Sequence, residues 1–318
     1  MFLLRILCVL FLIGAVLSSG LAQAAGTRIA ILSDDRTMNR QLRHKLELGL
    51  RQTGITDIVS GDLQGATSLP PETLRASDFT LVVGQAALRH ALRQGVRHHL
   101  LAVFLSQSAL EKELEQAGLQ NVRDVHAIVL DQPLRRYLDL IKLAFPQRQR
   151  IGLLASNDVF LPKNLEKQAQ ERGLEIKLER WGSSSATDST SGFIATLEAL
   201  MAQSDVFLAL PDAQIHNSAT VQPLLLTTYR FGIPVVAYSE AYGRAGALVS
   251  LYSTQEQLVR QAVDVMSQIR QGTRVPQILS PKNFTVSVNS TVARSLGLML
   301  PASETLRSQL YQNEKMAD

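Results

Sequence analysis

RIAILSDD at residues 28–35 and RIGLLASND at residues 150–158 share one pattern, and this repetition decides the fold. In both stretches a basic residue precedes an apolar run of strand length, and a turn of Ser, Asp or Asn residues follows. A run that is apolar at every position indicates a strand buried on both faces, as in a parallel sheet covered by helices. Two unrelated α/β first strands could share this pattern by chance. We interpret the repeat as the first strands of two similar lobes.

Similar apolar runs recur along the chain, at residues 79–83, 100–104, 205–210 and 234–238. The segments between the runs carry apolar residues at helical spacing. These residues are Leu42, Leu46 and Leu50, then Leu134, Leu138, Ile141 and Phe145, then Phe193, Leu197 and Leu200, and finally Leu258, Ala262, Val265 and Ile269. The alternation of strands and helices predicts an α/β fold with two doubly wound parallel-sheet lobes.

Three further extended runs, at residues 127–130, 247–251 and 284–288, predict a multi-strand hinge between the lobes. We therefore expect each lobe to draw on distant parts of the sequence. The expected division is a first lobe of residues 25–131 plus about 250–280, a second lobe of residues 132–249 plus about 281–300, and a C-terminal tail of residues 301–318.

The first 24 residues predict a cleavable secretory signal. Arg5 gives the start its positive charge, residues 6–16 are apolar, and Ala22 and Ala24 supply the small residues of a cleavage site. A buried N-terminal helix is the alternative, but this stretch offers it no polar face. We expect a periplasmic protein that lacks disulfides, since the only cysteine is Cys8.

The charge balance argues against nucleic acid as a partner. The chain has 32 Lys and Arg against 28 Asp and Glu, a formal charge of +4, and removing Arg5 with the signal leaves +4 − 1 = +3. No basic cluster is interleaved with aromatic residues. We expect a monomer of two domains that binds a small molecule.

Polar or glycine residues follow the ends of the predicted strands. In open α/β sheets ligands bind beyond these carboxyl ends, where loops and helix N-termini converge. The candidate ligand-binding residues are Ser33, Asp34, Gly84, Gln85, Asp131, Ser156, Asn157, Asp212, Ser239 and Glu240. Ser, Asp and Asn are also the preferred helix N-caps, so capping and ligand contact stay open for each position.

We expect that the protein is not an enzyme and that it has no metal site and no cofactor. Ser239 lacks the G-x-S-x-G turn of serine hydrolases, and no histidine follows it, the last being His216. The histidines show no metal-ligand spacing, so we interpret them as surface or cap residues. No glycine-rich phosphate loop occurs.

The second half of the chain resembles a known family. The stretch from residue 208 to 298 holds the Pro211-Asp212 turn, the pair Ser239-Glu240 and the run Pro281-Lys282-Asn283-Phe284. Together with residues 140–154, it resembles the ABC-transporter substrate-binding proteins related to tryptophan and tyrosine binders. These proteins resemble type I periplasmic binding proteins in fold.

The resemblance implies that two lobes close on a small polar, amino acid-like solute and that the closed form docks on an ABC permease in the inner membrane. It places Asp212, Ser239 and Glu240 in the wall of the second lobe, with Ser156 and Asn157 beside them. The first lobe departs from the family pattern, because Ser33-Asp34 stands where a His-Pro step is common. A periplasmic sensing or accessory subunit that uses the same cleft is the alternative function.

Overall fold

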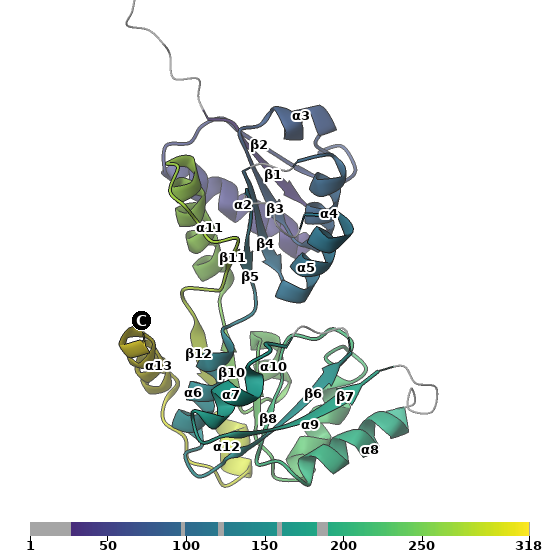
Figure 1. Cartoon of the computed structure of the whole chain (residues 1–318), viewed down its shortest axis with the longest axis vertical. Coiled ribbons are helices and arrows are strands. Elements are labelled where there is room, and N and C mark those ends of the chain that lie inside the picture. Colours follow the sequence, from purple (N-terminus) through teal and green to yellow (C-terminus); the bar gives the residue numbers. More distant parts are fainter. Residues whose placement is uncertain (1–26, 97–98, 120–123, 158–160, 183–189, 318) are drawn as a thin grey trace, which may run out of the picture.

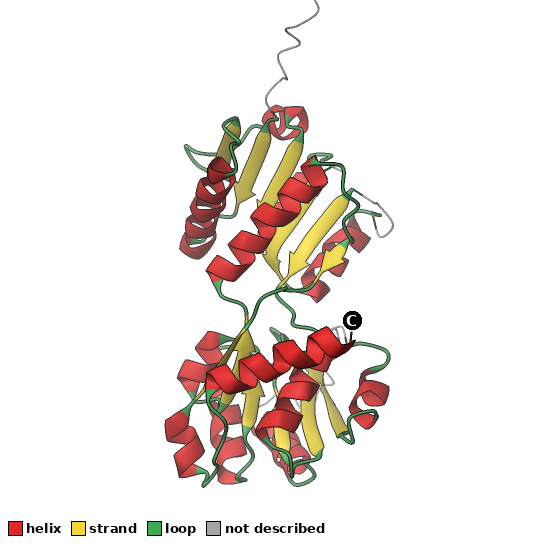
Figure 2. Ribbon diagram, turned by 90° about the vertical axis from the view of Figure 1, so that its left-hand side faces the viewer, coloured by secondary structure: helices red, strands yellow, loops and turns green. Residues whose placement is uncertain are grey.

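The protein consists of two α/β lobes joined by three chain crossings (Figures 1 and 2). The computed structural model describes residues 27–317, apart from 97–98, 120–123, 158–160 and 183–189. The predicted secretory signal at residues 1–24 therefore lies outside the described residues. Across the part of the chain that is described, we find no helix with the length and apolarity to cross a membrane.

The first lobe is a six-stranded sheet between two layers of helices. Its strands, in spatial order, are β11 (Ile278–Leu279), β5 (Val125–Val129), β4 (Leu100–Leu105), β3 (Phe79–Val83), β1 (Ile29–Ser33) and β2 (Ile58–Asp62). One face carries α2 (Thr37–Gln52) and α11 (Gln255–Arg270), and the other carries α3 (Pro71–Ala76), α4 (Gln85–Arg93) and α5 (Gln107–Gln116). All strand pairs of this sheet are parallel.

The second lobe repeats this plan. Its sheet has the order β12 (Thr285–Val288), β10 (Val249–Tyr252), β9 (Val235–Ala237), β8 (Val206–Leu208), β6 (Arg150–Ser156) and β7 (Glu175–Trp181). One face carries α6 (Leu134–Ala144), α7 (Leu165–Gln170), α12 (Ser290–Ser295) and α13 (Ser303–Ala317). The other carries α8 (Thr190–Met201), α9 (Val221–Arg230) and α10 (Glu240–Ala245). Only the β10–β12 pair is antiparallel among the described strands.

The continuous apolar runs arise because the central strands contribute to two cores at once. Successive side chains of a strand point to opposite faces of the sheet. Ile29 and Ile31 pack under α2 and α11, whereas Ala30 and Leu32 pack under α3, α4 and α5. All four side chains are inaccessible to solvent. The predicted doubly wound fold is thereby confirmed.

Two strands that the sequence did not predict, β2 and β7, lie at the sheet edges. An edge strand is paired on one side only, and its side chains are less covered. The sequence IVSGD of β2 and the sequence EIKLERW of β7 are mostly half-buried or exposed. They therefore lack the apolar run by which the central strands are recognised.

The chain passes between the lobes at three places, each next to an extended run noted in the sequence. The first crossing, residues 130–133, leads from β5 to α6, and the second, residues 253–254, leads from β10 to α11. The third, residues 280–284, leads from β11 back to β12. Residues 127–129, 249–251 and 285–288 are themselves strands of the two sheets. We propose the lobe boundaries within these three crossings.

The crossings fix the direction of both sheets. The chain leaves the first lobe at the carboxyl end of β5, which is parallel to its neighbours, so the carboxyl ends of the first sheet face the second lobe. It leaves the second lobe at the carboxyl end of β10, which is parallel to β9. The carboxyl ends of both sheets therefore face each other across the hinge (Figure 1).

The stretch expected to be a C-terminal tail forms α13 and packs on the second lobe. Leu306 and Leu310 are both inaccessible to solvent and lie in the same core as α6 and β12. The sequence alone does not predict this packing, because an amphipathic pattern does not show which surface the helix covers. Its burial makes α13 part of the second lobe's core.

Leu310→Ala should destabilise the protein by about 2–5 kcal/mol, because it leaves a cavity in a packed core. Met316→Ala on the same helix is the control, since Met316 is 79% exposed and should shift the free energy of unfolding by no more than about 0.5 kcal/mol. Urea unfolding followed by circular dichroism measures both. Equal effects of the two substitutions would show that α13 is not packed on the core.

Candidate functional site

The ten sequence-predicted residues lie on the two facing edges and on the first crossing. Four lie at or just after the ends of β1 and β3 in the first lobe, namely Ser33, Asp34, Gly84 and Gln85. Five lie at or after the ends of β6, β8 and β9 in the second lobe, namely Ser156, Asn157, Asp212, Ser239 and Glu240. Asp131 lies on the first crossing. The fold thus brings nine of them to the two facing sheet edges, which we call the two walls, while ligand binding by any of them stays a prediction.

Asp34, Asn39 and Gly84 form one fitted group on the first lobe. Asp34 is 6% exposed, and its Oδ1 accepts hydrogen bonds from Asn39 Nδ2 at 2.7 Å and from the backbone N–H of Arg36 at 3.1 Å. Gly84 has φ of +88°, and an added Cβ would lie 2.7 Å from Asn39 Nδ2. A side chain at residue 84 would therefore be strained and would push Asn39 away from Asp34.

Ser33 and Gln85 are engaged inside the first lobe. Ser33 is inaccessible to solvent, and its Oγ donates to Asp62 Oδ1 at 3.0 Å. Gln85 Nε2 donates to Glu113 Oε1 at 2.7 Å, and Glu113 also pairs with Arg89 at 2.6 Å. In this structure both side chains bind neighbouring elements of their own lobe.

Asp212 joins two strand ends of the second lobe. Its Oδ2 accepts from the backbone N–H of Ser156 at 2.7 Å, and its Oδ1 accepts from the N–H of Gln214 at 3.0 Å and of Ile215 at 3.4 Å. The side chain is buried, at 8% exposed for the residue. The carboxylate is therefore fixed in place by backbone donors from both β6 and the loop after β8. Asn157, the next residue along from Ser156, is exposed.

Ser239 caps α10, and Glu240 begins that helix. The Oγ of Ser239 accepts from the backbone N–H of Tyr242 at 3.2 Å, which is the N-cap geometry. Glu240 is exposed and pairs with Arg244 at 2.8 Å, one helical turn later. Capping, one of the two roles left open by the sequence, is thus the role of Ser239 in this structure.

The sequence reasoning missed an aromatic cluster formed by His216, Tyr238 and Tyr242. The ring centroids lie 5.4–5.8 Å apart, and the Tyr242 hydroxyl is 2.9 Å from His216 Nδ1. His216 is only 8% exposed, which corrects its interpretation as a surface histidine, and its Nε2 is buried without a hydrogen-bond partner. Two features of the sequence could have located this cluster. Tyr238 directly precedes Ser239, and His216 lies four residues after Asp212, which is one helical turn. In the structure the backbone N–H of His216 donates to the carbonyl oxygen of Asp212 at 2.7 Å.

Burial governs the ionisation of this cluster. It lowers the pKa of His216 to about 4, although the nearby Asp212 charge opposes the change. It also raises the pKa of Tyr238, and Asp212 adds to that effect. At neutral pH the histidine is therefore uncharged.

Asp131 connects the first crossing to the first lobe. Its Oδ2 accepts from the backbone N–H of Gln107, at the first turn of α5, at 2.7 Å. Burial raises the pKa of Asp131, and the bond from Gln107 partly offsets this. Asp131 is thus held by the first lobe at the point where the chain leaves it.

The two walls carry polar and aromatic groups but no metal-binding cluster among the described residues. The described residues contain no group of three or more His, Cys, Asp or Glu side chains arranged to hold a metal ion. What the walls offer instead is carboxylates, a hydroxyl, aromatic faces and helix N-termini, distributed over two lobes. Such groups can bind a small polar molecule from both sides.

Comparison with known proteins agrees with this geometry. Residues 102–308 match the model of a family described as ABC transporter substrate binding protein. No curated protein matches the chain.

Several solved structures share the fold. A conserved domain protein from Vibrio cholerae is similar at 19% identity, with 88% of this chain and 98% of that chain covered and a TM-score of 0.58. An ABC domain in complex with L-Trp from Streptococcus pneumonia has 16% identity, coverages of 88% and 97%, and a TM-score of 0.56. The ligand-free, open structure of a substrate binding protein with adhesive properties from Clostridium difficile has 16% identity, coverages of 87% and 97%, and a TM-score of 0.65.

Acid should destabilise the protein through His216. Its pKa falls from the ordinary 6.5 to about 4 on folding, so the unfolded chain takes up this proton first as the pH drops. The stability from neutral His216 is complete above pH 6.5 and declines toward pH 4, by about 3 kcal/mol at most. His216→Gln should remove this part of the pH dependence.

Urea unfolding of the wild-type protein and of His216→Gln at several pH values between 7 and 4 measures the difference. The same substitution at His44, which is exposed on α2, is the matched control. If the curves of the wild-type protein and His216→Gln fall in parallel, His216 does not titrate as its burial implies.

Proposed function

Because the chain belongs to the family of ABC transporter substrate-binding proteins, we propose that it captures a small, polar, amino acid-like solute between its two lobes and delivers it to an ABC permease of the inner membrane. Its place of action in this proposal is the periplasm. The protein does no chemistry on the solute, and it works as a monomer that opens and closes.

The observation that carries the proposal is the facing arrangement of the two sheets. Polar groups at the carboxyl ends of β1 and β3 lie on one lobe, and those of β6, β8 and β9 lie on the other. A solute that contacts both walls binds the closed form more tightly than the open form, and this difference in affinity drives closure. The three crossings supply the hinge for that motion.

The charges of the walls favour a solute with an amino group. Asp34 and Asp212 are fixed by hydrogen bonds of their own lobes, yet a carboxylate has about four acceptor positions, so each retains acceptor capacity. The N-termini of α4 and α10 follow Gly84 and Ser239, and backbone amides there suit a carboxylate. An amino acid carries both groups.

The aromatic cluster adds an apolar surface to the second wall. Tyr238 is half-buried and packs against His216 and Tyr242, so one aromatic face lies beside Asp212 and Ser239. Among similar structures, the Streptococcus pneumonia domain is a complex with L-Trp. Both observations support an amino acid with an apolar side chain as the solute.

A screen of the purified protein against amino acids, small peptides, sugars, nucleosides and oxyanions should show a raised melting temperature with amino acids. Ligand at a hundredfold excess over its Kd stabilises the folded state by about 2.7 kcal/mol. Differential scanning fluorimetry measures the shift. The amino acid assignment would be wrong if only another class of solute stabilised the protein, and solute capture itself would be wrong if no class did.

Asp34→Asn should weaken binding of the identified amino acid by roughly 10-fold to 100-fold, the range expected when one hydrogen bond to a charged group is lost. The amide can keep the two bonds that Oδ1 accepts from Asn39 and Arg36, so the wall itself should persist. Asp35→Asn is the matched control, because Asp35 is the exposed neighbour. Isothermal titration calorimetry compares the three proteins, and equal affinities would remove Asp34 from the site.

A further inference from the structure

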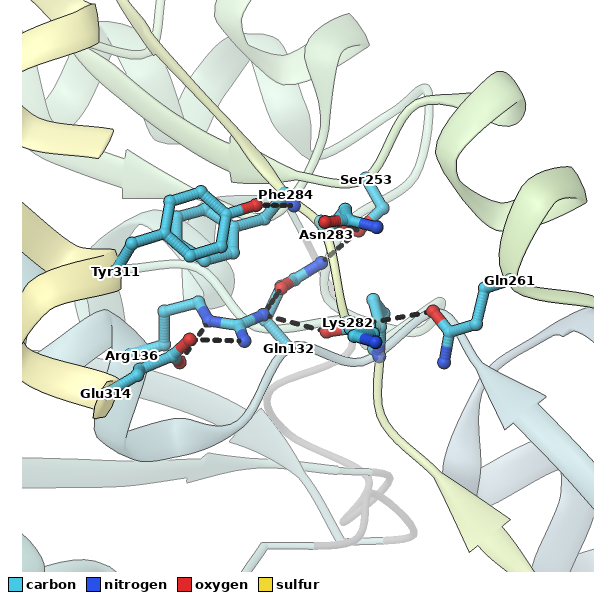
Figure 3. A network of polar contacts seen from close by, with 10 residues as sticks. Gln132, Arg136, Ser253, Gln261, Lys282, Asn283, Phe284, Tyr311 and Glu314 are labelled. Carbon is cyan, nitrogen blue, oxygen red and sulfur yellow. Dashed lines mark hydrogen bonds and ion pairs between the residues drawn. The ribbon is translucent and has the colours of Figure 1, made fainter. Parts of the chain in front are cut away.

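Arg136 is a buried charge at the place where the crossings meet (Figure 3). It lies on the first turn of α6 and is 4% exposed. Its Nε and Nη2 bind the carboxylate of Glu314 on α13 at 2.6 and 3.0 Å. Its guanidinium also lies 4.1 Å from the ring centroid of Phe284, on the third crossing.

One guanidinium nitrogen ties two crossings together. Arg136 Nη1 donates to Gln132 Oε1 on the first crossing and to the carbonyl oxygen of Pro281 on the third crossing, the latter at 3.1 Å. Arginine has five N–H donors in a rigid plane, so fixing its far side also fixes the direction of Nη1. Glu314, by binding Nε and Nη2, supplies that fixation.

The second crossing joins the same network. Gln132 Nε2 donates to Ser253 Oγ at 2.9 Å, and that hydroxyl donates to the carbonyl oxygen of Asn283 at 2.6 Å (Figure 3). A continuous series of hydrogen bonds thus runs from Arg136 through the first and second crossings to the third. These hydrogen bonds hold the three crossings together at their second-lobe ends.

The first lobe holds the crossings at neighbouring residues. Gln107 of α5 binds Asp131, and Gln261 of α11 accepts from the N–H of Lys282 at 2.8 Å and donates to the carbonyl oxygen of Ser280 at 3.0 Å. Thr254 caps α11. Bending can therefore concentrate between residues 131 and 132, 253 and 254, and 282 and 283, where the contacts change from one lobe to the other.

Two residues are exceptions to this division. The carbonyl oxygen of Phe284 accepts from Gln257 Nε2 of α11 at 3.4 Å, and Pro281 is the second exception. Its carbonyl oxygen binds Arg136 of the second lobe, while the residues on either side of it bind Gln261 of the first lobe. The contact between Arg136 and Pro281 therefore spans the bending zone. Its strength affects how far the lobes can move apart or together.

Helix α13 reaches this zone from the second lobe at two points. Besides Glu314, it presents Tyr311, whose hydroxyl accepts from the backbone N–H of Phe284 at 3.2 Å and whose ring stacks on the Phe284 ring at 4.3 Å. The buried Leu306 and Leu310 anchor the same helix in the core. Figure 3 shows Glu314 of this helix paired with Arg136 next to the crossings.

We propose that α13 is a brace for the hinge: Glu314 fixes Arg136, Arg136 holds the first and third crossings together, and the brace narrows the range of lobe separations that the ligand-free protein samples. A buried ion pair with satisfied hydrogen bonds suits this role, because its partners have one arrangement rather than many. The inference rests on the proposed opening and closing of the lobes. Its test needs no ligand, so it can fail or succeed independently of solute capture.

The test measures the distribution of distances between spin labels on the two lobes by double electron–electron resonance. Labels at Lys112→Cys on α5 and Gln222→Cys on α9 report the separation, since both positions are exposed. The background is Cys8→Ser, which removes the only native thiol. In this background, Glu314→Gln should broaden the distance distribution of the ligand-free protein.

Glu304→Gln is the matched control, because it removes an exposed ion pair with Arg307 on the same helix without touching the crossings. It should leave the distribution unchanged. Tyr311→Phe removes only the hydroxyl that holds Phe284, so it carries the test if Glu314→Gln does not fold, and it should also broaden the distribution. Unchanged distributions in the folded hinge variants, or equal broadening by Glu304→Gln, would overturn the proposal.

Discussion

The direction of the parallel strands is the constraint on which the rest of the structure depends. The chain leaves each sheet at a strand's carboxyl end, from β5 in one lobe and from β10 in the other. Because the central strands of each sheet are parallel, the remaining central strands must end at the same edge as β5 or β10. Loops and helix N-termini gather at these two edges, and the hinge lies between them. The positions of the candidate site and of the bending zone therefore both follow from the strand direction, which is toward the hinge in both lobes.

Much of this fold could be predicted from the sequence, because a strand buried on both faces leaves a continuous apolar run as its mark. β1, β3, β4 and β6 are apolar at almost every position, and their ends locate the polar edge residues. The edge strands β2 and β7 are only partly covered, so no such mark exists for them. The sequence predicts a C-terminal tail where helix α13 lies, because a pattern alone does not show which surface an amphipathic helix covers.

Sequence patterns could place the candidate residues at strand ends but could not predict their contacts, and their binding of a ligand stays a prediction. Strand ends correctly locate Asp34 and Asp212, but no spacing rule shows that Ser33 turns inward to Asp62 while Asp34 meets Asn39. His216 acquires its low pKa from burial against Tyr238 and Tyr242, residues more than 20 positions away. The pair Arg136–Glu314 joins residues 178 positions apart. Such contacts depend on the finished fold and leave no local trace.

The interleaving of the lobes has a consequence for how the protein is made. Helix α11 covers one face of the first sheet, and β11 completes that sheet's edge, although both follow most of the second lobe in the sequence, up to β10. Until residues 255–279 have been synthesised, the apolar face around Ile29, Leu81 and Leu101 has only α2 as cover. The first lobe therefore begins to be translated first and yet cannot finish folding before residue 279 has been synthesised, so the nascent chain stays incompletely folded through most of its synthesis.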